Sequence, residues 1–92
     1  MLTKYRAFER STMRTTAFIY FAPNPNIPSQ IVATIVPVEL DGATKAMDMP
    51  TPRFDYFTSG TKESDMAIAL LKGVGLTDDD LEHRISFANV PA

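Results

Sequence analysis

The sequence predicts an α+β fold: a mainly antiparallel β-sheet of about four to five strands, with one or two short helices packed on one face. Three observations predict it. Segments rich in β-branched and aromatic residues, separated by proline-containing breaks, occupy most of residues 15–59. Apolar residues then follow a helical period between residues 63 and 74. A helix-start pattern comes next, and a short alternating segment closes the chain.

Composition limits the class of protein. A chain of 92 residues has room for one hydrophobic core, so we expect residues 1–92 to form a single domain. Its hydrophobic and charged fractions, 45% and 22%, are ordinary for a globular domain. The absence of cysteine excludes disulfides and thiolate chemistry and fits a reducing compartment. No apolar run approaches the ~20 residues of a membrane span, so we expect a cytoplasmic protein with no membrane partner.

The first 30 residues contain one clear strand. Residues 1–12 show no clear period, and we expect either a frayed element or an arm that is flexible until a partner orders it. Thr15–Ala22 alternates between two largely apolar faces, which predicts a central strand with Phe18 and Phe21 in the core. Three prolines and two asparagines in residues 23–30 predict a loop.

The middle of the chain predicts a hairpin. Ile31–Leu40 has the composition of a strand, and Pro37 within it favours an edge position or a bulge. Asp41-Gly42 fits a two-residue type I′ turn, which would place Leu40 opposite Ala43 in a returning strand that runs to residue 49. After a second proline break, Arg53–Ser59 resumes extended structure, with its aromatic side chains at positions 54 and 56 on one face.

Two helices and a last strand follow. Apolar spacing predicts a helix over Glu63–Lys72, with Thr61 or Ser64 as its N-cap and Gly73 or Gly75 at its end. In the next helix Thr77 is the expected N-cap, Asp80 takes the capping-box position, and Leu76 and Leu81 form the hydrophobic staple. Alternation over Arg84–Val90 predicts the final strand.

The stretch Arg14–Phe21, RTTAFIYF, resembles the octamer with which RNA-recognition-motif domains stack bases, K/R-G-F/Y-G/A-F-V-x-F/Y. Thr15 replaces the glycine, and Thr16 replaces a base-stacking aromatic. The order also differs, because this strand is the third in such domains and only 13 residues precede it here. We therefore interpret the stretch as a buried central strand.

Few residues are suited to catalysis. His83, the only histidine, lies near a predicted helix C-terminus, where it offsets the helix dipole or is exposed. The three aspartates at 78–80 are consecutive helix residues, so their side chains splay about 100° apart and cannot form a catalytic pair or a metal site without other ligands. No spacing matches a calcium loop or a phosphate loop. We expect no enzyme activity, no catalytic or metal-binding residue, no cofactor and no small-molecule substrate.

Charge is unevenly spread along the chain. Residues 1–14 carry a net +3, so the remainder carries −5 of the total of −2. Cations alternate with aromatics in this basic segment, which suits phosphates and bases or an acidic protein surface, although a solvated face has the same pattern. Translation from Met13 would omit three of these cations. The proline-asparagine loop is a second candidate contact, and the acidic helix start is a third. The candidate partner-binding residues are Lys4, Tyr5, Arg6, Arg10, Arg14, Asn24, Asn26, Asp78, Asp79, Asp80 and Glu82.

The chain as a whole, from MRTTAFIYFAPNPNIPSQ through GVGLTDDDLEHR, resembles the small phage-encoded anti-CRISPR proteins, and among them inhibitors of the type I-F surveillance complex. The resemblance lies in size, absent cysteine, absent catalytic motif and α+β pattern, so no residue role is carried over. It implies a non-enzymatic inhibitor that binds a multi-subunit Cas protein complex of the host bacterium, with contact to its guide RNA, and stops target DNA from hybridising. The acidic cluster would then mimic DNA on a basic surface, or the basic segment would touch RNA or an acidic patch.

Two alternatives from other classes remain. A small nucleic-acid-binding or regulatory protein of a mobile element should bind free nucleic acid with a steep salt dependence. A structural subunit of a phage particle should self-assemble, with the Ile31–Leu40 strand pairing across chains.

Overall fold

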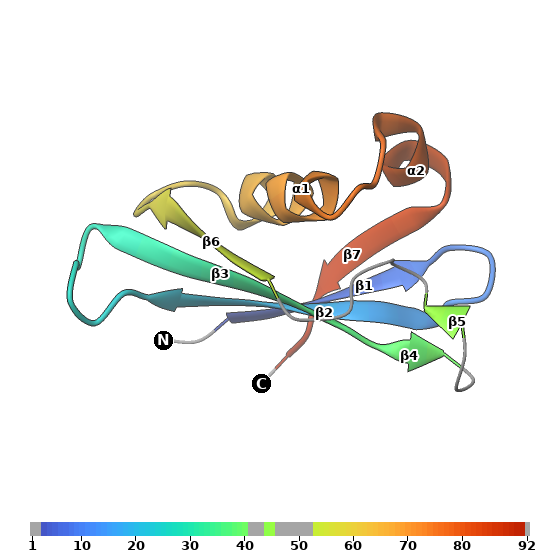
Figure 1. Cartoon of the computed structure of the whole chain (residues 1–92), viewed down its shortest axis with the longest axis horizontal. Coiled ribbons are helices and arrows are strands. Elements are labelled where there is room, and N and C mark those ends of the chain that lie inside the picture. Colours follow the sequence, from blue (N-terminus) through green and yellow to red (C-terminus); the bar gives the residue numbers. More distant parts are fainter. Residues whose placement is uncertain (1–2, 41–43, 46–52, 92) are drawn as a thin grey trace.

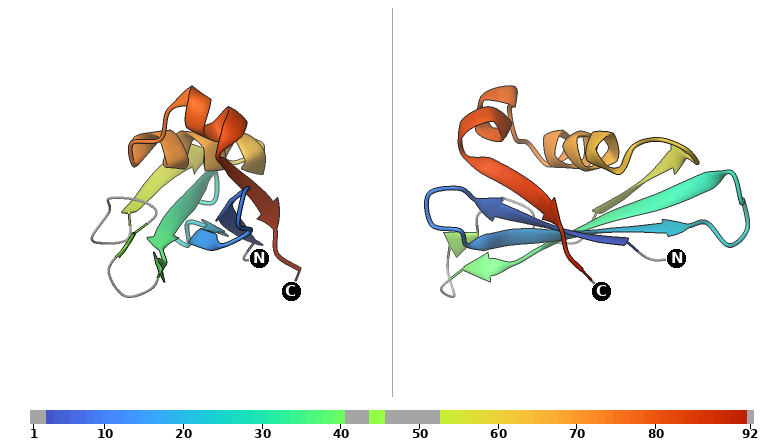
Figure 2. Two further views of the ribbon diagram at one scale, coloured as in Figure 1. Left: turned by 90° about the vertical axis from the view of Figure 1, so that its right-hand side faces the viewer. Right: turned by 180° about the vertical axis from the view of Figure 1, so that it is seen from behind.

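The computed structural model describes residues 3–40, 44–45 and 53–91, and its main element is a five-stranded antiparallel sheet (Figure 1). The strand order is β6-β3-β2-β1-β7. Both helices lie over one face of this sheet, as the further views in Figure 2 also show. The predicted α+β class is therefore confirmed. The elements are β1 (Thr3–Glu9), β2 (Thr15–Pro23), β3 (Gln30–Pro37), β6 (Arg53–Thr58), β7 (Ile85–Asn89), the separate hairpin β4 (Glu39–Leu40) and β5 (Thr44–Lys45), and the helices α1 (Glu63–Gly73) and α2 (Asp78–His83).

The core lies between the sheet and α1. Side chains alternate between the two faces of a strand, so every second residue points toward the helices. Helix α1 supplies its buried residues at helical spacing from the other side. The buried apolar side chains are Ala7, Ala17, Ile19, Phe21, Ala33, Ile35, Met66, Ala67, Leu70, Leu71 and Ile85. Removing this set from water is the main force that joins the two layers.

Strand β2 occupies the centre of the sheet, as the sequence predicts. Ile19 and Phe21 are buried under the helices, whereas the alternate residues point to the opposite face. The expectation that Phe18 joins Phe21 in this core is wrong, because residues an odd number of positions apart in a strand lie on opposite faces. Phe18 is half-buried on the far side of the sheet.

Residues Thr3–Glu9 form strand β1, so of the two expectations for residues 1–12 the structure favours the strand over the flexible arm. Strand β1 lies between β2 and β7, with Lys4 opposite Tyr20 and Arg6 opposite both Phe18 and Ala88. Its alternation is hard to recognise because the register shifts between Ala7 and the next residue, as at a β-bulge. Its second partner, β7, also comes from the other end of the chain.

Strand β3 is not at an edge, contrary to the prediction from Pro37, since it pairs with both β2 and β6. Pro37 is its last residue. The N–H of Val38 donates to the carbonyl of Thr16 in β2. Because backbone N–H groups alternate along a strand, the nitrogen of Pro37 faces the β6 side. The residue pairs between β3 and β6 end earlier, at Ile35, so within the described residues Pro37 breaks no hydrogen bond of the sheet. A phage subunit that assembles through this strand is therefore not supported.

The hairpin after β3 has a different register from the predicted one. Leu40 pairs with Thr44 rather than with Ala43, so three residues connect β4 to β5 where a type I′ turn would use two. The Asp41-Gly42 turn itself, and the returning strand beyond Lys45, lie outside the described residues.

Helix α1 begins at Glu63 and ends at Gly73, close to the predicted bounds. Its N-cap is Lys62, without a side-chain cap, so neither Thr61 nor Ser64 has the predicted capping role. At the other end Gly75 has a φ of +104°, and the N–H groups of Gly75 and the next residue donate to the carbonyls of Lys72 and Leu71. This is a Schellman motif, which favours glycine at this position.

Helix α2 begins as predicted. The Thr77 side chain accepts from the Asp80 N–H at 3.1 Å, and the Asp80 carboxylate accepts from the Thr77 N–H at 3.0 Å. This reciprocal capping box satisfies two donors that the helix itself cannot pair. The backbone hydrogen bond from Thr77 is the largest cause that lowers the pKa of Asp80, and Arg84 adds to it. Neither helix, over the residues that the structure describes, has the length and apolar character of a membrane span.

Candidate functional site

The first candidate site is the side of the five-stranded sheet that the helices do not cover, and we call it the open face. Cross-strand pairing lines its side chains up in rows. One row runs Phe54, Thr34, Tyr20 and Lys4 from β6 to β1. The next row, Val36, Phe18, Arg6 and Ala88, runs from β3 to β7. The open face thus carries aromatic residues next to cations across several strands.

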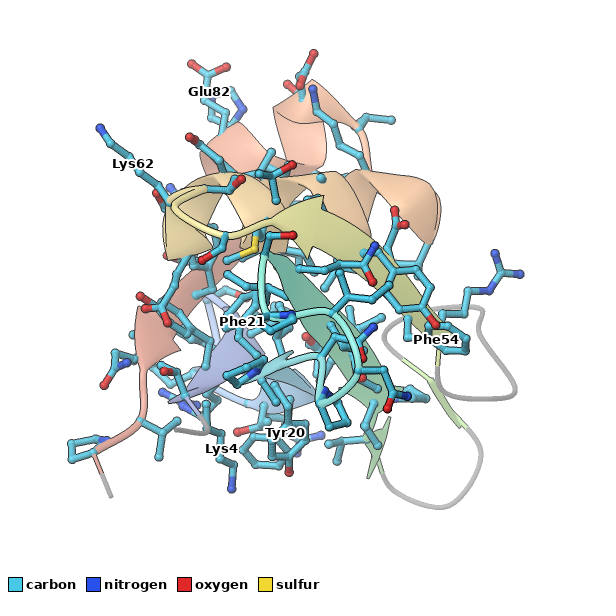
Figure 3. All side chains as sticks on the ribbon, turned by 90° about the vertical axis from the view of Figure 1, so that its left-hand side faces the viewer. Lys4, Tyr20, Phe21, Phe54, Lys62 and Glu82 are labelled. Atoms are coloured by element: carbon cyan, nitrogen blue, oxygen red, sulfur yellow. The ribbon has the colours of Figure 1, made fainter. Side chains whose placement is uncertain are left out.

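Lys4 is held over two aromatic rings of the open face. Its Nζ lies 4.3 Å from the centroid of the Phe18 ring and 5.7 Å from that of Tyr20. A cation at this distance from a ring is attracted to the negative face of the π system. The ammonium is therefore positioned on the surface of the sheet, where it can still meet an anion from solvent. Figure 3 places Lys4 and Tyr20 together, on the side of the sheet away from Lys62 and Glu82.

Arg6 is also fixed in place. Its Cζ lies 4.5 Å from the centroid of the Phe8 ring, and its Nη1 donates to the carbonyl of Met13 and to the hydroxyl of Thr15, both at 3.1 Å. These bonds tie the guanidinium to the β1–β2 connection. Arg6 thus presents a positive charge with little freedom to move.

Two aromatic residues on β6 extend the open face to the edge of the sheet. Phe54 is 61% exposed and Tyr56 is 49% exposed, which is unusual for rings of this size. Their centroids lie 5.6 Å apart in an edge-to-face arrangement. An exposed aromatic pair on the same sheet face as two cations can contribute contact area to a partner at small entropic cost.

Positive and negative side chains lie on different layers of the molecule, the positive ones on the open face and many negative ones on the helices. No acidic side chain of the five-stranded sheet points to the open face, because Glu9 and Asp55 alternate to the helix side. The helices carry acidic residues in both first turns. The chain is acidic overall, yet the open face is basic. This separation favours a polyanionic partner at the sheet and disfavours one at the helices.

The structure divides the predicted binding residues. Lys4 and Arg6 lie on the open face. Tyr5 points to the helix side, where its ring packs against Phe21 and Phe87 and its hydroxyl donates to Glu63 Oε1 at 3.1 Å. Burial is the main cause that raises the pKa of Tyr5, followed by this bond. Tyr5 therefore belongs to the core, not to the surface.

The two remaining arginines lie around the β1–β2 connection. Arg10 Nη2 donates to the carbonyl of Leu81 at 2.8 Å and so joins this connection to α2. Arg14 is exposed and immediately precedes β2. Neither lies in the rows of the open face.

The asparagines of the β2–β3 connection stabilise a turn. Asn24 Nδ2 donates to Gln30 Oε1 at 2.8 Å, and Asn24 Oδ1 accepts from the Asn26 N–H at 2.9 Å. The second bond forms an Asx turn. The predicted projecting loop is thus held by its own side chains.

The acidic cluster at α2 is engaged inside the chain. Asp78 pairs with Lys72 at 2.6 Å, Asp79 Oδ1 lies 3.1 Å from His83 Nδ1, and Asp80 pairs with Arg84 at 2.8 Å. His83 is exposed in the last turn of the helix, as predicted. Glu82 is exposed on the same helix. A DNA-mimicking role would require these carboxylates to exchange partners.

A cavity of about 290 Å³ lies at the end of the sheet below the start of α1. Its apolar wall includes Phe21, Ile31 and Met66, and its one carboxylate is Glu63, which already accepts the Tyr5 hydroxyl. Among residues 3–40, 44–45 and 53–91, no group of three or more His, Asp or Glu side chains is arranged to hold a metal ion. The open face therefore remains the strongest candidate site.

Comparison of the chain with protein-family models, with curated proteins and with solved structures gives no match.

Proposed function

We propose that this chain is a non-enzymatic inhibitor that binds a CRISPR–Cas surveillance complex through the open face and prevents target DNA from hybridising with the guide RNA. The observation that carries the proposal is the basic, aromatic sheet face on an otherwise acidic protein. Such a face is complementary to the guide RNA or to an acidic patch of the complex. The choice of a CRISPR–Cas surveillance complex as the partner rests on the resemblance of the whole chain to anti-CRISPR proteins.

The charge distribution favours one of the two docking modes that the sequence leaves open. In the DNA-mimic mode, the three aspartates of α2 would give up Lys72, His83 and Arg84 in order to bind a basic protein surface. In the other mode, Lys4 and Arg6 already sit on the open face in fixed positions. A preorganised surface loses less entropy on binding, so we propose the second mode.

The test mixes the purified protein with a type I-F surveillance complex and measures co-migration and labelled target-DNA binding by gel shift. Lys4→Glu should weaken the complex by about tenfold or more, because a carboxylate would replace the ammonium that lies over the aromatic rings of the face. Lys62→Glu is the matched control, since it makes the same charge change on the helix side. It should leave binding within about twofold of wild type.

Three results would decide the proposal. Co-migration with loss of DNA binding, sensitive to Lys4→Glu alone, supports inhibition through the open face. Inhibition that is lost with Asp78→Lys but kept with Lys4→Glu would replace this mode with the DNA-mimic mode. DNA binding left intact, with no co-migration, would refute the inhibitor function.

A second candidate function is a nucleic-acid-binding or regulatory protein of a mobile element. The observation that favours it is the contact of Lys4 and Arg6 with aromatic rings on one sheet face, an arrangement that can hold phosphates beside stacked bases. This protein would bind free single-stranded nucleic acid without any Cas subunit. Its affinity should fall with salt with a slope of about −0.7 per phosphate contacted, and Lys4→Glu should reduce that slope.

A further inference from the structure

Among residues 3–40, 44–45 and 53–91, no strand pairs with the outer edge of β6. The strand lies at one end of the sheet (Figure 1). Every residue of it except Phe57 is exposed. An edge strand presents unpaired N–H and C=O groups, which natural proteins usually cover or protect with charge. The side chains of β6 therefore indicate whether this edge repels or accepts another strand.

The backbone N–H groups of β6 point outward at even positions. The Tyr56 N–H donates to the carboxylate of Asp55 at 2.8 Å, so it points away from β3. By alternation the N–H and C=O of Phe54 point the same way. Further along, the Thr58 carbonyl is taken by Thr61. The segment available to a new strand is therefore centred on Phe54.

The two charged residues of β6 are complementary to a second copy of the same strand. Arg53 and Asp55 both lie on the helix side, opposite Ile35 and Ala33 of β3. An antiparallel pair centred on Phe54 places Arg53 of each copy opposite Asp55 of the other. Centring the pair on Asp55 instead would place two carboxylates opposite each other, which is unfavourable. One register is thus selected by charge.

We propose that this chain forms a symmetric homodimer by antiparallel pairing of β6 with β6 of a second copy, in the register that places Arg53 opposite Asp55. The inference is independent of the proposed inhibitor function. It joins two five-stranded sheets edge to edge, so that the two open faces become one continuous surface with Phe54 at its centre.

Space beside the edge fits this arrangement. On the helix side a hollow of about 170 Å³ lies between β6 and α1, and Ala69 and Gly73 are among its lining residues. A Cβ built on Gly73 meets no atom within 4 Å. The stem of Arg53 from the second copy can lie in this hollow while its guanidinium reaches Asp55.

The test measures mass by sedimentation equilibrium over about 1 to 200 µM, because a short edge gives a small interface and a micromolar dissociation constant. Wild type should be a dimer at the upper end. Asp55→Arg and Arg53→Asp should each weaken the dimer by about tenfold or more, since each places like charges across the pair. The double swap R53D/D55R should restore dimerisation. An equimolar mixture of the two single variants should form the mixed dimer.

The outcomes separate the proposal from its rivals. A wild type that stays monomeric at the highest concentration overturns it. So does a dimer that Asp55→Arg leaves intact, which would indicate association through another surface such as the β7 edge. Far-UV circular dichroism and the melting temperature of each variant confirm folding, and both substituted side chains are exposed. If the single variants failed to dimerise only because they were destabilised, dimerisation would not return in the double swap or in the mixture.

Discussion

Thr16 offers a test of the packing in which a single substitution should stabilise the protein. Its side chain is 0% exposed on β2, and in the part of the chain that the structure describes its Oγ1 has no hydrogen-bond partner. A buried hydroxyl without a partner costs about 1–3 kcal/mol of desolvation. Valine has nearly the same shape and keeps the β-branched preference for a strand. Thr16→Val should therefore remove that cost without opening a cavity.

We expect Thr16→Val to raise the free energy of unfolding by about 1–2 kcal/mol, and each kcal/mol corresponds to a rise of about 4–8 °C in Tm for a domain of this size. The assay is urea unfolding followed by circular dichroism and by tyrosine fluorescence, with the m-value compared between variants. An unchanged m-value shows that the midpoint shift reports stability rather than a change in the unfolded chain.

The matched control is Thr34→Val, on the adjacent strand β3 and half-buried on the same face. Its hydroxyl is not among the buried unpaired atoms, so the change in unfolding free energy should stay within about 0.5 kcal/mol. A Thr16→Val protein that is no more stable than wild type, or less stable, would refute the reasoning. It would mean that the hydroxyl is satisfied, for example by an ordered water.

Further predictions concern the core, the helix ends and pH. Ile19→Ala, at a fully buried site on the central strand, should lower the free energy of unfolding by about 2–5 kcal/mol in urea titrations. Gly75→Ala should lower the Tm, because φ is +104° there, whereas Gly73→Ala in the helical end of α1 should leave it unchanged or raise it. The pKa of Asp80 is lower in the folded state than in the unfolded state, so its contribution to stability is complete above about pH 5 and is lost as the pH falls below about 4. Asp80→Asn should accordingly be less stable than wild type at pH 6, with a difference that shrinks at pH 3 in matched urea titrations.

Local signals in the sequence predicted the parts of the fold that depend on neighbours in the chain. The capping box of Thr77 and Asp80, the bounds of α1 and the alternation of β2 all arise from contacts within a few residues. Residue type and spacing are sufficient to predict these elements, because the residues that interact lie within the same helical turn or the same strand. The final strand was predicted for the same reason.

What only the tertiary structure decided is where each element lies and which face it exposes. Strand β1 enters the sheet because β7, from the other end of the chain, pairs with it, and no local pattern contains that pairing. Of the basic segment, Lys4 and Arg6 lie on the sheet face opposite the acidic helix starts, whereas Arg10 contacts α2, and no local pattern predicts this division. Lys4 and Arg6 were predicted as binding residues, but Phe18 and Tyr20 beside them were not. Both faces of β2 are apolar, and only the placement of the helices determines which of the two is covered.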